Sequence, residues 1–143
     1  MSALPPIATL VPHAPPMLAV ERLLDCAPGR ATAAMTVRDG LFARDGQVDS
    51  VVLLEYMAQA VAACLGLEAT AAGGNVRVGM VIACRSLTIA RPSVRVGEEL
   101  TIRVERVRGT DQVSHFDGET RDATGAVVAR TTLTLVHGER PPE

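Results

Sequence analysis

The chain has 143 residues, a formal net charge of −2 at pH 7 and 48% hydrophobic residues, which suit one soluble domain. All 14 basic residues are arginine, so a Schiff-base lysine, a lysine-anchored pyridoxal phosphate and a Walker A phosphate loop are excluded. The small excess of acidic residues and the 2% aromatic content argue against nucleic-acid binding.

Residues 1–20 carry no charged side chain except His13 when it is protonated, and five prolines interrupt them with no basic stretch in front. We therefore expect neither a signal peptide nor a membrane span. The cysteines Cys26, Cys64 and Cys84 form no C-x-x-C pair, so neither a disulfide framework nor a metal site is expected. A reduced, cytoplasmic protein is predicted, with Cys64 and Cys84 as small core residues.

The first half of the chain predicts one dominant element. A helical or irregular segment near residues 17–24 and a strand over 30–38 precede it. Residues 50–72 predict a long helix, because helix-forming residues fill it and two glycines follow it. Its only charged residues are Glu55 and Glu68, so most of its surface must be enclosed by other elements.

The second half predicts strands that enclose this helix. Strand patterns cover residues 76–84, 86–90, 100–105, 112–121 and 127–136, with glycine-containing turns between most of them. One helix cannot cover both faces of a flat sheet of this size. The economical arrangement is an α+β hotdog fold, in which a curved antiparallel sheet wraps around the helix. We expect a single domain over residues 1–143, with its core at about 10–137 and a second copy continuing the sheet.

Two residues stand out as an acid and a base. Glu55 lies near the start of the apolar helix, where burial favours the protonated acid; a partly exposed cap partner is the alternative. Gln59 lies one turn later, where its amide either holds the Glu55 carboxyl or packs against backbone. His13 lies between prolines that restrict its backbone, either as a base or as a histidine that ties the loop together.

The remaining polar candidates are weaker. His115 lies within a strand and is predicted to be structural or exposed, and His137 lies beside the C-terminal tail and is predicted to be solvated. Arg85, Arg91 and Arg95 form a modest basic cluster. They are either solvated or placed to meet the phosphate of a phosphopantetheine or the acidic surface of a carrier protein.

Three segments, in order, resemble the FabZ-like 3-hydroxyacyl-acyl-carrier-protein dehydratases. Residues 10–25 resemble their L-P-H-R-x-P-[FM]-L-L-[VL]-D-R-V opening, residues 53–60 their E-x-M-A-Q helix, and residues 84–100 their R-x-P-V and G-D-x-L strand pair. Residues 41–50 contain no histidine, whereas those enzymes carry a G-H-F-P-G loop with the catalytic histidine. The chain is therefore more similar to the divergent ApeP dehydratases of aryl polyene clusters.

The resemblance implies dehydration of 3-hydroxyacyl thioesters on acyl carrier protein to trans-2-enoyl thioesters, in fatty-acid-like or aryl polyene biosynthesis. Glu55 is then the acid and His13 the base, and free N–H groups near Val51 and Val52 polarise the thioester carbonyl, with Gln59 as a further substrate-binding residue. No metal or cofactor is implied beyond the phosphopantetheine that carries the substrate. The family also implies a homodimer, or a heterodimer with another hotdog subunit.

Two alternatives remain open. A hotdog acyl-thioesterase would use a carboxylate on the same helix to activate water. A non-catalytic subunit would instead complete an active dehydratase partner, and the missing loop histidine favours this reading.

Overall fold

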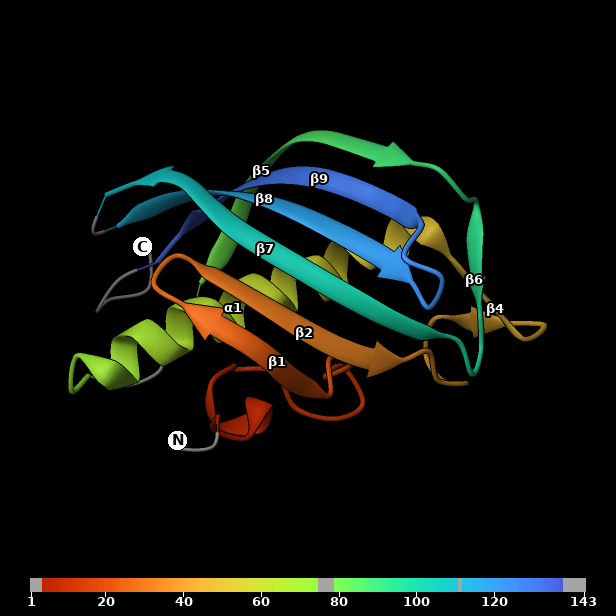
Figure 1. Cartoon of the computed structure of the whole chain (residues 1–143), viewed down its shortest axis with the longest axis horizontal. Coiled ribbons are helices and arrows are strands. Elements are labelled where there is room, and N and C mark those ends of the chain that lie inside the picture. Colours follow the sequence, from red (N-terminus) through yellow and green to blue (C-terminus); the bar gives the residue numbers. More distant parts are fainter. Residues whose placement is uncertain (1–3, 75–78, 111, 138–143) are drawn as a thin grey trace.

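The computed structural model describes residues 4–74, 79–110 and 112–137. Its main sheet is antiparallel and has the strand order β1-β2-β7-β8-β9-β5. These strands are β1 (Arg22–Ala27), β2 (Arg30–Thr36), β5 (Met80–Ile89), β7 (Glu99–Gly109), β8 (Val113–Asp122) and β9 (Val127–Val136). The sheet curves over one helix, α1 (Leu53–Ala71), which agrees with the α+β arrangement expected from the sequence (Figure 1).

Smaller elements complete the fold. The order β3-β4-β6 forms a second sheet from β3 (Ala43–Arg44), β4 (Gln47–Asp49) and β6 (Ser93–Arg95). Two 3-10 helices, η1 (Ile7–Thr9) and η2 (Ser50–Val52), lie in the N-terminal segment and directly before α1. The predicted helix over residues 50–72 is therefore one 3-10 turn followed by α1.

Helix α1 supplies the centre of the core. It contacts β2, β7, β8 and β9, and its side chains Leu53, Met57 and Val61 are fully buried. The segment Ser50–Ala71 is long and apolar enough to cross a membrane, but more than half of it is buried inside the fold. Its apolar character is thus accounted for by burial of the helix under the sheet.

Two sequence predictions differ from the structure. Residues 17–24 were predicted to be helical or irregular, yet β1 already begins at Arg22, and its bulge between Leu23 and Asp25 hides the period-two pattern. The strands predicted over 76–84 and 86–90 are one strand, β5, which bulges near Arg85. Residues 75–78 lie outside the described part of the chain.

Strand β5 forms one edge of the main sheet and is exposed along nearly its whole length. Nine of its ten residues are exposed, including the apolar Met80, Val81, Ile82 and Ile89. Cys84 is also exposed, so its prediction as a core residue is wrong; Cys64 is buried as predicted. An apolar strand with an open edge is a surface suited to another sheet.

Candidate active site

The N-terminal segment brings His13 to the first turn of α1. His13 Nε2 lies 3.3 Å from Glu55 Oε1, and the two side chains are 25% and 34% exposed. Ile7, Leu10 and Val20 are buried and anchor the segment on either side of this contact. The structure therefore brings together the two residues that the sequence suggests as base and acid.

Gln59 links Glu55 to the same segment. Its Nε2 donates to Glu55 Oε1 at 3.1 Å and to the carbonyl of Met17 at 2.7 Å. Its Oε1 accepts from the backbone N–H groups of Ala19 and Val20. An amide has two donor and two acceptor positions, so all four are occupied by protein groups. In this arrangement Gln59 orients the pair, and a direct contact with substrate would require one of these bonds to break.

The His13 and Glu55 atoms outside their mutual contact have different surroundings. His13 Nδ1 is buried and has no hydrogen-bond partner among the described residues, so Nε2 is the ring nitrogen that faces the groove. Among the described residues Glu55 Oε2 has no hydrogen bond or ion pair, whereas Oε1 accepts from Gln59 and lies next to His13.

The predicted backbone donors are arranged differently from the expectation. The N–H of Val51 donates to Asp49 Oδ1 at 3.0 Å, so it is not free, and the expectation that it is available for a thioester carbonyl is wrong. Asp49 competes for it because it is the N-cap of η2. Val52 is the last residue of η2 and lies half-buried against the core, directly before α1.

A groove of about 1450 Å³ leads away from His13 and Glu55 along α1. One face of the helix lines it, because residues spaced by three and four positions share a face. Its lining on α1 consists of Glu55, Ala58, Ala62, Leu65, Glu68 and Ala69, and Ala72 lines it directly after the helix. Met80 and Val81 of β5 also line the groove, and its lining on the middle of α1 is largely small and apolar.

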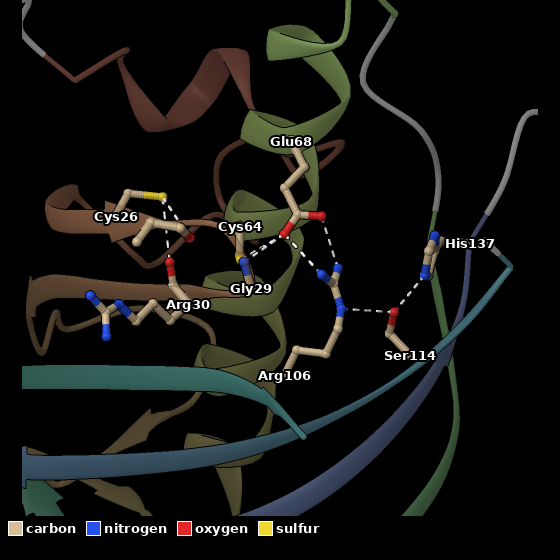
Figure 2. A network of polar contacts seen from close by, with 9 residues as sticks. Cys26, Gly29, Arg30, Cys64, Glu68, Arg106, Ser114 and His137 are labelled. Carbon is tan, nitrogen blue, oxygen red and sulfur yellow. Dashed lines mark hydrogen bonds and ion pairs between the residues drawn. The ribbon is translucent and has the colours of Figure 1, made fainter. Parts of the chain in front are cut away.

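A polar network stands at the other end of the groove (Figure 2). Arg106 Nη1 and Nη2 donate to the two carboxylate oxygens of Glu68 at 3.1 and 2.9 Å, and the Gly29 N–H donates to the same carboxylate. Arg106 Nε donates to Ser114 Oγ, which lies 2.8 Å from His137 Nε2. The prediction that His137 is solvated is wrong, because its ring is partly buried and bonded to Ser114.

Charge and burial act in opposite directions in this network. Burial alone would raise the pKa of Glu68, but hydrogen bonds from Arg106 and Gly29 and the charge of Arg106 hold that pKa below its usual value. Burial raises the pKa of the Cys64 thiol to about 12, and the neighbouring Glu68 charge adds to this. Cys64 is therefore a protonated core thiol at neutral pH, as its small-core prediction requires.

The other candidates lie outside the groove. His115 Nδ1 is 2.9 Å from Thr134 Oγ1 on β9, which fits a structural role. Arg91 pairs with Glu98 and Asp122, while Arg85 and Arg95 have exposed positions. The sequence offered no signal for the network at Arg106, because it depends on how the ends of β7, β8 and α1 meet in space.

Comparisons with known proteins identify a family and a fold for this chain. The ApeP-like family, described as ApeP dehydratase, matches residues 5–142. The 3-hydroxyacyl-[acyl-carrier-protein] dehydratase FabZ of Granulibacter bethesdensis is 29% identical over 137 residues, covering 91% of this chain and 79% of that protein. The dehydratase heterocomplex ApeI:P from Xenorhabdus doucetiae has a TM-score of 0.89 at 22% identity, covering 99% of this chain and 94% of the other.

A hypothetical thioesterase from Streptococcus pneumoniae is also similar in structure. It was solved with coenzyme A and has a TM-score of 0.66 at 16% identity, covering 84% of this chain and 88% of the other. Both structural matches show the hotdog fold that the sequence predicts.

Proposed function

The chain belongs to the ApeP-like dehydratase family, and on that premise we propose that it removes water from 3-hydroxyacyl thioesters on acyl carrier protein in polyene biosynthesis, with His13 as base and Glu55 as acid. The observation that carries this proposal is the 3.3 Å contact between His13 Nε2 and Glu55 Oε1 at one end of the groove. The acyl chain would lie along the alanine-lined face of α1.

The reaction starts with neutral His13 and protonated Glu55. His13 Nε2 takes the proton from C2 of the substrate, the C3–O bond breaks, and Glu55 Oε2 gives its proton to the departing hydroxyl. The products are water and the trans-2-enoyl thioester, and the protein is left with a histidinium and a carboxylate. Transfer of the new proton from His13 Nε2 to Glu55 Oε1 returns a neutral histidine and a protonated carboxyl, and exchange of that proton from Oε1 to Oε2 through water restores the starting pair. The steps are proton transfers and one C–O bond cleavage, so the proposal assigns this chain no metal or redox cofactor.

Substrate placement is also part of the proposal. Gln59 keeps the Glu55 carboxyl oriented through its bond to Oε1. The turn η2 lies directly before Glu55. Because Asp49 is its N-cap, the Val52 N–H lies in the first i→i+3 bond of the turn, and as our candidate donor to the thioester carbonyl it would exchange that bond for one to substrate. The phosphopantetheine arm of the carrier protein brings the thioester to this end of the groove.

A second hotdog subunit completes the assembly in our proposal. Strand β5 pairs with β9 on one side, and its other edge has no partner strand among the described strands. Support for a different subunit as the partner comes from the structural likeness to the ApeI:P heterocomplex. The absence of histidine from residues 41–50 favours, as a second candidate, a subunit whose role is to complete an active partner.

The test uses the purified chain, alone and with its co-expressed hotdog partner, and a 3-hydroxyacyl carrier protein. Mass spectrometry follows the loss of water. We expect Glu55→Gln and His13→Ala to lower kcat by about 10²–10⁴-fold, the usual value of a general acid or base. The control is Glu99→Gln, which changes an exposed carboxylate on β7.

Three outcomes would change the proposal. Wild-type turnover by both variants would remove His13 and Glu55 from the mechanism. Undiminished turnover of a partner-containing complex that carries either variant would favour the non-catalytic subunit. Release of the free acid and thiol without an enoyl product would establish a thioesterase.

A further inference from the structure

The N-terminal segment is fixed to α1 on both sides of His13. On the C-terminal side, Gln59 bonds the carbonyl of Met17 and the N–H groups of Ala19 and Val20. On the N-terminal side, Leu10 is fully buried and lies against the helix. The three-residue step from Leu10 to His13 includes Pro12, whose ring limits the backbone. A shift at Leu10 is therefore passed on to the His13 ring.

Gly66 is the residue of α1 that Leu10 touches. A Cβ placed on Gly66 would overlap the carbonyl oxygen of Leu10 and lie 2.8 Å from its carbonyl carbon and 3.1 Å from its Cα. The neighbouring atoms are backbone, so they cannot rotate away as the end of a side chain can. Gly66 is the one glycine within α1, at a position where glycine is intrinsically less favourable than alanine. The close approach of Leu10 is a physical reason for its presence.

We propose that Gly66 is a positioning residue for His13: by lacking a side chain it lets Leu10 lie directly on α1, and this sets the contact between His13 Nε2 and Glu55 Oε1. The effect on turnover rests on the proposed function, whereas the effect on the position of His13 does not. Gly66 itself is buried and does not line the groove, so its influence on the reaction is indirect.

The first experiment compares Gly66→Ala with Gly40→Ala. The new methyl at residue 40 meets nothing within 4 Å, so it is a matched control in open space. Because backbone atoms must move away from the new methyl of Gly66→Ala, we expect kcat to fall by about 10–100-fold, the effect of misplacing a catalytic group by roughly an ångström. KM should stay unchanged, since neither Gly66 nor Leu10 lines the groove.

A double-mutant cycle separates positioning from general damage. If Gly66 acts through His13, adding Gly66→Ala to His13→Ala should cause no further loss of the residual turnover. Additive losses, or wild-type kcat in Gly66→Ala, would overturn the proposal.

A spectroscopic measurement tests the position without any turnover. In ¹⁵N-labelled protein, Glu55→Gln should shift the ring resonances of His13, because the two side chains are in contact. The same change in the Gly66→Ala background should shift them less than half as much, while the His115 resonances stay in place. An equal shift in both backgrounds would refute the positioning role even if His13 proved unnecessary for turnover.

A second variant, Pro12→Gly, tests the same proposal if Gly66→Ala does not fold. Pro12 is exposed, so Pro12→Gly removes little packing while freeing the backbone between Leu10 and His13. We expect the same loss of kcat and the same weakened response of His13 to Glu55→Gln. Wild-type behaviour of Pro12→Gly in both measurements would show that the Leu10 contact does not position His13.

Discussion

The His13–Glu55 contact assigns a separate task to each atom of the pair. His13 Nδ1 is buried without a partner among the described residues, which leaves Nε2 to exchange protons. Glu55 Oε1 is held by Gln59 and faces His13, which leaves Oε2 toward substrate. In our proposal this one contact orients the acid and base and provides the path that resets them after each turnover.

Glu68 lends itself to a pH-dependent test of stability. Its pKa is lowered in the fold, so its ionised form stabilises the protein at pH values above its unfolded pKa, and this stability is lost as the pH falls through the folded value. We expect Glu68→Gln to lower the free energy of unfolding at pH 7 by about 1–2 kcal/mol, since the bonds to Arg106 and Gly29 are weakened at a partly exposed site.

Urea denaturation at pH 7 and at pH 3 measures this difference, with Glu99→Gln as the control on an exposed carboxylate. The gap between wild type and Glu68→Gln should be smaller at pH 3 than at pH 7, because the stability that ionised Glu68 supplies declines as the pH falls toward its lowered pKa. A gap that is the same at both pH values would show that the charge of Glu68 does not supply the stability.

At the scale of elements, the bounds of long regular strands and helices can be predicted from the sequence, whereas short or bulged strands cannot. Strand β9 was predicted over residues 127–136 and has those bounds, because the segment is rich in valine and threonine, which favour strands. Strand β3 has two residues, too few for any periodic pattern. In β1 and β5, bulges interrupt the alternation on which such predictions depend.

Some features of the candidate site could likewise be predicted from the sequence, and others could not. The proximity of His13 and Glu55 was expected from motifs that resemble a known family, whereas the Asp49 cap that occupies the Val51 N–H depends on a side-chain rotamer. The hydrogen bonds of Arg106 to Glu68 and Ser114 join residues of α1, β7 and β8. Because these bonds depend on how the elements pack, no local sequence pattern predicts them.

The alanine face of α1 makes the groove sensitive to side-chain size. Ala62 lies in the middle of the lining, so Ala62→Phe should block the groove beyond it. We expect KM for a 3-hydroxydecanoyl carrier protein to rise about tenfold or more, while a 3-hydroxybutyryl substrate is unaffected, because overpacking costs on the order of 1–3 kcal/mol. Steady-state kinetics with both substrates measure this, and the control is Ala71→Phe at an exposed position. Equal effects on both substrates would place the acyl chain elsewhere.

At the scale of the whole molecule, the outer edge of β5 is the surface on which we expect a partner subunit to bind. Ile82 is 55% exposed on this strand, so Ile82→Glu should weaken association with the partner subunit by about tenfold or more. Analytical ultracentrifugation of the co-purified complex measures the change. Val107→Glu is the control, since Val107 is an equally exposed apolar residue on β7, away from this edge. Unchanged association of Ile82→Glu would show that β5 is not the interface.

Because β5 also lines the groove through Met80 and Val81, the proposed β5 interface would link assembly and activity by mass action. A protomer that dissociates from its partner on dilution would have the β5 side of its groove exposed to solvent. We therefore expect specific activity to decline with dilution rather than stay constant. By the same linkage, a substrate that binds more tightly to the assembled protein than to the separate protomer favours association. The melting temperature of the protein should then rise with its own concentration, and rise again when substrate is present.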